Sequence, residues 1–96
     1  MLEKDLERQV VNYCKAKGVL TYKFTSPAHR GVPDRVMMAN GKTLFLELKR
    51  PGGKPTALQL REIQKIEQAG VKAAWTDSLG GAQLLIDFYL LSQKPC

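Results

Sequence analysis

Two acidic residues and a lysine could share one site on a predicted hairpin: Asp34, Glu47 and Lys49. Between the acids lies Asn40-Gly41, and an Asn-Gly pair flanked by apolar residues predicts a two-residue type I′ turn. With these two as the loop residues, Asp34 lies directly opposite Glu47, provided the hairpin has no bulge. Two carboxylates on one face repel each other unless a cation lies between them, so the turn predicts a metal site.

Alternation along the second strand of the hairpin supports the same site. Counting outwards from the turn, the expected partners are Ala39 with Lys42, Met38 with Thr43, and Val36 with Phe45. Further along, the three leucines of 43–49 point to one face, whereas Glu47 and Lys49 point to the other, beside Asp34. Glu and Lys are also common on exposed strands, where they interact only with solvent and with the neighbouring strand. The register of Asp34 nevertheless favours the chemical interpretation.

Phosphodiester hydrolysis, which the family resemblance described below implies, is the reaction considered for such a site. A metal lowers the pKa of a water molecule and neutralises charge on the transition state. Oxygen ligands suit Mg²⁺ or Mn²⁺, and the single histidine and two scattered cysteines argue against zinc. Lys49 would orient or activate the attacking water and stabilise charge on the phosphate, with an ordinary ion pair as the alternative.

The chain of 96 residues is expected to form one domain, 1–96, and its charge favours a polyanionic partner. The formal net charge is +6 and the pI is about 9.6. Several candidate DNA contacts flank the proposed site: Lys23, His29, Arg30, Arg35, Arg50 and Lys54. A solvated basic surface is the alternative. The histidine is expected to bind rather than catalyse, with a general-base role as its alternative.

The sequence pattern predicts an α/β fold with a mixed central sheet flanked by helices, in the order α-β-β-β-α-β-α. The expected elements are a helix over 2–17, a strand over 19–24, a loop over 25–33, the hairpin over 34–49, a helix over 56–69, a strand over 71–76 and a last helix from 78 or 80 to about 92. The strand–helix–strand crossover predicts a parallel pair. Because the last helix is apolar almost all round, it is either buried within the chain or covered by a second copy.

Cysteine usage and hydropathy indicate the expected compartment. Cys14 and Cys96 are far apart and form neither a disulfide framework nor a zinc spacing, so both are expected to be reduced thiols in a cytoplasmic protein. There is no run of eighteen apolar residues, and the chain is charged from Glu3 onwards. Neither a transmembrane helix nor a signal peptide is expected.

An ordered set of short motifs resembles a known group of nucleases. Gly31-Val32-Pro33-Asp34, Glu47-Leu48-Lys49 and Pro55-Thr56-x-x-Gln59 are similar to the PD-(D/E)XK superfamily, and within it to the small stand-alone form of the VRR-NUC (virus-type replication-repair nuclease) family. The resemblance covers nearly the whole chain. It implies a restriction-endonuclease-like core, divalent-metal-dependent DNA cleavage, similarity to dimeric Holliday-junction resolvases, and a phage or prophage as a fitting source.

The resemblance also implies roles for individual residues. Its metal ligands would be Asp34, Glu47 and the backbone carbonyl of Leu48, and Lys49 would be the catalytic lysine. The family also has a glutamate on its first helix. Glu3 matches the usual VRR-NUC position, whereas Glu7 resembles the first helix of archaeal resolvases. The two lie four residues apart on one helix face, so both could approach the metal, and either could be an ordinary solvated acid.

Gln59 and the substrate each leave alternatives open. As N3 of a capping box, Gln59 would bond back to Thr56, whereas the resemblance implies a catalytic role. The main expectation is a homodimeric endonuclease for branched DNA that resolves four-way junctions. The alternatives are a monomeric nuclease for flaps, ends or nicks, and a non-catalytic DNA-binding module with the same fold.

Overall fold

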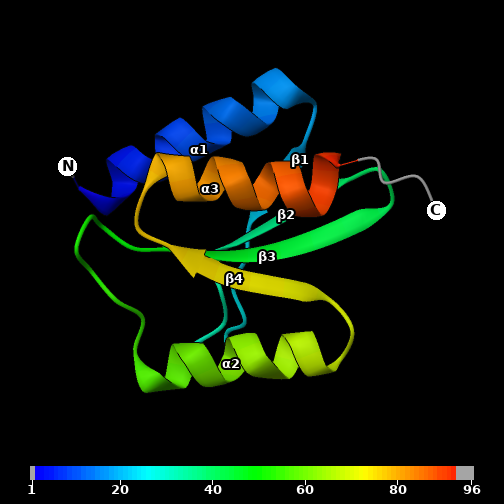
Figure 1. The fold of residues 1–96 in the computed structure, drawn as a ribbon. Coiled ribbons are helices and arrows are strands. Elements are labelled where there is room, and N and C mark those ends of the chain that lie inside the picture. The colour runs from blue at the N-terminus through cyan, green and yellow to red at the C-terminus, as the bar shows by residue number, and fades with distance from the viewer. Residues whose placement is uncertain (1, 93–96) are drawn as a thin grey trace.

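Four strands form one sheet in the order β1-β2-β3-β4, with helices on both of its faces (Figure 1). The computed structural model describes residues 2–92. Its elements are α1 (Glu3–Lys17), β1 (Leu20–Lys23), β2 (Arg35–Ala39), β3 (Lys42–Leu48), α2 (Ala57–Gln68), β4 (Lys72–Thr76), α3 (Leu79–Ile86) and a π-helical turn, η1 (Asp87–Leu91). In Figure 1, α1 and α3 lie together on one side of the sheet and α2 lies on the other. The predicted order and the mixed α/β sheet are confirmed.

The β2–β3 hairpin has the predicted register. Asn40 and Gly41 both have positive φ angles, 56° and 74°, as a type I′ turn requires. Ala39 pairs with Lys42, and the pairing continues without a bulge as far as Arg35 and Leu46. A tight turn with no extra residue therefore sets which side chains of the two strands face each other.

The crossover from β3 through α2 to β4 gives the predicted parallel pair. Glu47 lies beside Trp75 in this register, and Leu48 lies beside Thr76. The ladder continues one residue beyond β3, because the Lys49 N–H donates to the Thr76 carbonyl at 3.0 Å. Lys49 is therefore held in a continuation of the strand.

The hydrophobic core lies between the sheet and the layer of α1 and α3. Leu44, Leu46 and Leu48 of β3 are buried in it. Side chains four apart on α1 line the other side, namely Leu6, Val10 and Cys14, each fully buried. The leucines occupy one face of β3 completely, so the alternate residues of the strand project towards α2.

The last helix is only partly covered by the other described residues. Ala82, Ile86 and Leu90 are fully buried in the core, whereas Leu84 is 73% exposed and Phe88 is 58% exposed. Burial within the chain therefore accounts for one face of α3 and η1, and an apolar face remains at the surface.

The cysteines and the lengths of the helices concern two further expectations. Cys14 is a buried thiol, and Cys96 lies outside the described residues. Within residues 2–92, no helix has both the length and the apolar character needed to cross a membrane.

Candidate active site

Two acids lie opposite each other at the open end of the β2–β3 hairpin, away from its turn. Asp34 directly precedes β2, and one further step of the register beyond Arg35 and Leu46 places it opposite Glu47. Glu47 is 2% exposed, and burial, followed by the charge of Asp34, raises the pKa of Glu47 to about 7. Burial also raises the pKa of Asp34, and a hydrogen bond from the Leu48 backbone opposes this shift. Burial therefore favours the neutral form of both carboxyl groups.

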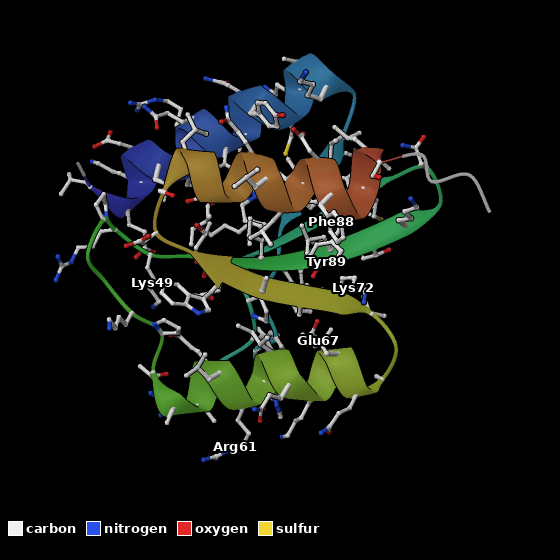
Figure 2. The ribbon with its side chains drawn as sticks, in the orientation of Figure 1. Lys49, Arg61, Glu67, Lys72, Phe88 and Tyr89 are labelled. Carbon is white, nitrogen blue, oxygen red and sulfur yellow. The ribbon has the colours of Figure 1, made fainter. Side chains whose placement is uncertain are left out.

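Lys49 places a positive charge beside the acid pair. Its Nζ lies 3.2 Å from Glu47 Oε2, and only 18% of its side chain is exposed. The lysine lowers the pKa of both carboxyls and so partly offsets their burial. Figure 2 shows Lys49 at one end of the sheet, with Lys72 at the other end. The charged cluster is thus confined to the end where β3 finishes.

Gln59 combines the two roles that its position allows. Its Oε1 accepts from the Thr56 N–H at 2.9 Å, while its own N–H donates to Thr56 Oγ1 at 3.1 Å, which completes the capping box. Its Nε2 donates to Glu47 Oε2 at 3.2 Å. The cap that starts α2 therefore also orients the amide towards the acid pair.

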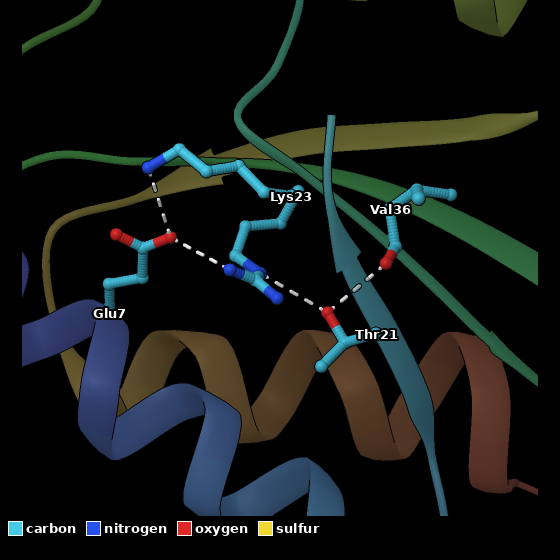
Figure 3. A network of polar contacts seen from close by, with 5 residues as sticks. Glu7, Thr21, Lys23 and Val36 are labelled. Carbon is cyan, nitrogen blue, oxygen red and sulfur yellow. Dashed lines mark hydrogen bonds and ion pairs between the residues drawn. The ribbon is translucent and has the colours of Figure 1, made fainter. Parts of the chain in front are cut away.

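Glu7 lies close to the site but is engaged by two cations. Its Oε2 accepts from Arg35 Nη1 at 2.8 Å and lies 3.7 Å from Lys23 Nζ (Figure 3). Arg35 Nε in turn donates to Thr21 Oγ1 at 3.2 Å. Glu7 nonetheless raises the pKa of Asp34, so its charge reaches the acid pair.

Glu3 lies one helical turn earlier and is exposed. Its charge contributes to the raised pKa of Glu47, which places it within electrostatic range of the other acid of the pair. Of these two glutamates of α1, one is therefore exposed and the other is held by an arginine.

The acid pair has the chemistry of a cation site. Glu47 Oε1 is buried and has no hydrogen-bond partner among the described residues. An unpaired buried acceptor is costly, and a hard cation prefers oxygen donors of this kind. Across residues 2–92, no group of three or more His, Cys, Asp or Glu side chains is close enough together to hold a metal ion. The residues fit a divalent cation as a pair, with further ligands still to be supplied.

Arg35 differs from the role predicted for it. It was expected to contact DNA, yet it is only 8% exposed and its guanidinium bonds Glu7 and Thr21. The reason is alternation along β2: Arg35 directly follows Asp34, so it projects to the opposite face, towards α1. Arg35 is therefore held inside the protein and is not available as a DNA contact.

The other predicted DNA contacts lie at the surface. The exposed members are Lys23, His29, Arg30, Arg50 and Lys54. His29 also has a protein partner, because its Nε2 lies 2.9 Å from Glu62 Oε1.

Glu62 is a residue of this region that sequence reasoning missed. It is 5% exposed on α2, next to the buried Ile63 and three residues after Gln59. An acid on the apolar face of an amphipathic helix was the available signal, since such a position usually needs a partner.

Known proteins resemble this chain in sequence and in fold. No family model matches the sequence. The chain is 44% identical over 77 residues to "Putative nuclease p44" of Acyrthosiphon pisum secondary endosymbiont phage 1, covering 79% of this chain and 83% of the phage protein. A solved structure described as "VRR_NUC domain" matches with a TM-score of 0.80 and 26% identity, over 91% of this chain and 96% of that one. Another, "VRR_NUC domain protein", shares the fold with a TM-score of 0.76 and 16% identity, over 93% and 88% of the two chains.

The raised pKa of Glu47 predicts a pH-dependent stability of the metal-free protein. The unfolded chain releases this proton near pH 4.5 and the folded chain near pH 7, so the free energy of unfolding falls as pH rises between them. We expect Glu47→Gln to be more stable than the wild type by about 1–3 kcal/mol at pH 8, and the difference to vanish near pH 5. Urea unfolding in EDTA measures both, and Glu67→Gln, an exposed acid of α2, is the control. A stability gain independent of pH would contradict the assignment.

Proposed function

The chain belongs to the VRR-NUC nuclease family, and on this premise we propose that it is a divalent-metal-dependent endonuclease that hydrolyses phosphodiester bonds in branched DNA. One observation carries the proposal: in the acid pair, Glu47 is buried, its Oε1 has no hydrogen-bond partner within residues 2–92, and a lysine and a glutamine are directed at the same carboxylate. The phage source of p44 supports an intracellular setting.

Asp34, Glu47, the Leu48 carbonyl and a glutamate of α1 would hold the metal, which we propose to be Mg²⁺ or Mn²⁺. When bound, such an ion lowers the pKa of a water molecule and neutralises charge on the phosphate. Lys49 carries a positive charge 3.2 Å from the Glu47 carboxylate, where it would stabilise the charge that develops on the reacting phosphate. Gln59 would hold the orientation of Glu47 through its amide.

The first-helix ligand is proposed to be Glu3 rather than Glu7. Glu7 is balanced by Arg35 at 2.8 Å and by Lys23 at 3.7 Å, and a buried guanidinium would lose its partner if Glu7 turned away. Glu3 is exposed and acts electrostatically on Glu47. Glu7 would then support the site by holding Arg35 against the sheet.

DNA binding is proposed to be electrostatic and sequence-independent. The exposed cations around the acid pair would neutralise phosphates, which makes binding sensitive to salt. They are Lys23, Arg30, Arg50 and Lys54, with His29 as a further contact. One acid pair in each chain cuts one strand, whereas a four-way junction needs two coordinated cuts, so we propose a homodimer that resolves junctions.

Cleavage assays test the proposed function. The wild type is expected to cut a labelled four-way junction with Mg²⁺ or Mn²⁺ and to be inactive in EDTA, while Lys49→Ala is expected to lose at least about a hundredfold in rate and still bind the junction. Preference for a flap or linear duplex would favour the monomeric nuclease. A wild type that binds but cuts no DNA would leave only the binding module. Equal loss of cutting and binding in Lys49→Ala would make the lysine structural.

The two acids of α1 are expected to separate in two measurements. Glu3→Gln should weaken Mn²⁺ binding in calorimetry and leave stability unchanged, because its carboxylate is exposed. Glu7→Gln should lower the free energy of unfolding by about 1–3 kcal/mol, since it weakens a charged hydrogen bond to the buried Arg35. The reverse pattern would make Glu7 the ligand.

The proposed dimer is expected to use the exposed apolar face of the last helix. Leu84 is 73% exposed there, and apolar side chains at an obligate interface are shielded on association. Sedimentation at micromolar concentration should show a dimer for the wild type and a monomer for Leu84→Asp, with Leu20→Asp on the sheet as the control. A wild type that stays monomeric with junction DNA present would contradict the dimer.

A further inference from the structure

Glu62 is a buried acid that the proposed chemistry does not use. It lies on the face of α2 that packs towards the sheet, and only 7% of its side chain is exposed. Its Oε1 is 2.9 Å from His29 Nε2, and its Oε2 accepts from Lys65 Nζ at 3.1 Å. The histidine and the lysine both lower the pKa of Glu62, so it is ionised and has a partner for each oxygen. One of these partners belongs to its own helix and the other to a distant loop.

The loop over 25–33 packs directly on α2 at this contact. Gly31 has a φ of +89°, and a Cβ added there would lie 2.8 Å from Leu58 Cγ and 3.3 Å from Glu62 Cγ. Leu58 and Glu62 are four residues apart, so they form one patch of the helix surface. Within the loop, the His29 N–H donates to the Ser26 carbonyl at 3.0 Å. A backbone without a side chain therefore brings the loop close enough for the histidine to reach Glu62.

The same loop leads directly into the acid pair. Pro33 is fully buried, and the Asp34 carbonyl accepts from the Phe24 N–H at 2.6 Å. The sheet therefore holds the two ends of the loop, and α2 holds its middle. Gly31 and His29 lie only three and five residues before Asp34. A displacement of either residue would therefore also displace Asp34.

Helix α2 thus contacts Glu47 directly and is connected to Asp34 through the loop that precedes it. Gln59 bonds Glu47 directly at 3.2 Å, and Glu62, on the same helix face, holds the loop that ends at Asp34. We propose that His29 and Glu62 form a clamp between the loop and α2, and that this clamp sets the position of the Asp34 carboxylate for the metal. Both are positioning residues, and the inference rests on the proposed function.

Matched variants test the clamp in the full chain. His29→Ala and Glu62→Ala are each expected to weaken Mn²⁺ binding about 5- to 10-fold in calorimetry, and the double variant no further, because either change opens the same contact. Glu62→Gln should restore most of the affinity, since its amide oxygen can still accept from the histidine. Lys65→Ala is the control: it removes the other partner of Glu62 and leaves the loop contact intact.

A second readout needs no metal. In EDTA, amide hydrogen exchange in residues 25–33 is expected to speed up in His29→Ala and Glu62→Ala and to stay unchanged in Lys65→Ala. If the wild type binds no Mn²⁺, the proposed function fails, and unchanged loop exchange would then overturn the clamp as well. Unchanged Mn²⁺ affinity in His29→Ala, with weaker junction binding, would overturn the clamp and leave His29 with a role in DNA binding alone.

Discussion

The buried carboxylate of Glu47 beside Asp34 is the electrostatic constraint around which this end of the sheet is arranged. Glu47 Oε2 is bonded by Gln59 and Lys49, whereas Oε1 has no partner in the described part of the chain. Burial and the neighbouring acid raise the pKa of Glu47 to about 7. A group in this condition is typical of functional sites, because a protein gains no stability from it. A cation between the two acids would relieve both the repulsion and the unpaired acceptor, which connects the electrostatics with the proposed chemistry.

One face of the sheet forms the hydrophobic core, and the other carries the charged residues of the candidate site. The leucines of β3 pack against α1 and α3. Glu47 and Lys49, which alternate with these leucines, project towards α2. The same alternation divides the consecutive residues Asp34 and Arg35, so that one joins the acid pair and the other bonds Glu7 on α1. Arg35, although it is adjacent in sequence to an acid of the pair, thereby supports the core side of the sheet.

Helix α2 links the parts of the site that the sheet alone would leave unsupported. Its capping box fixes Gln59, and Gln59 reaches Glu47 with the part of its amide that the cap does not use. Three residues further on, Glu62 holds His29 and the loop before Asp34. The crossover that makes β3 and β4 parallel also places α2 next to Glu47. The same connection therefore sets both the strand topology and the position of Gln59 in the site.

Local patterns were sufficient to predict the hairpin, the opposition of the two acids, the capping box and the parallel crossover. The hairpin, the opposed acids and the capping box depend on a turn, an alternation or a cap, and the crossover depends on the order strand–helix–strand. The sequence by itself determines these. The second bond of Gln59, the burial of Arg35 against Glu7 and the contact between His29 and Glu62 were not predicted. They join side chains of different elements or loops, and their distances depend on how α1 and α2 pack on the sheet. Only the tertiary structure decided them, because packing many side chains together sets those positions.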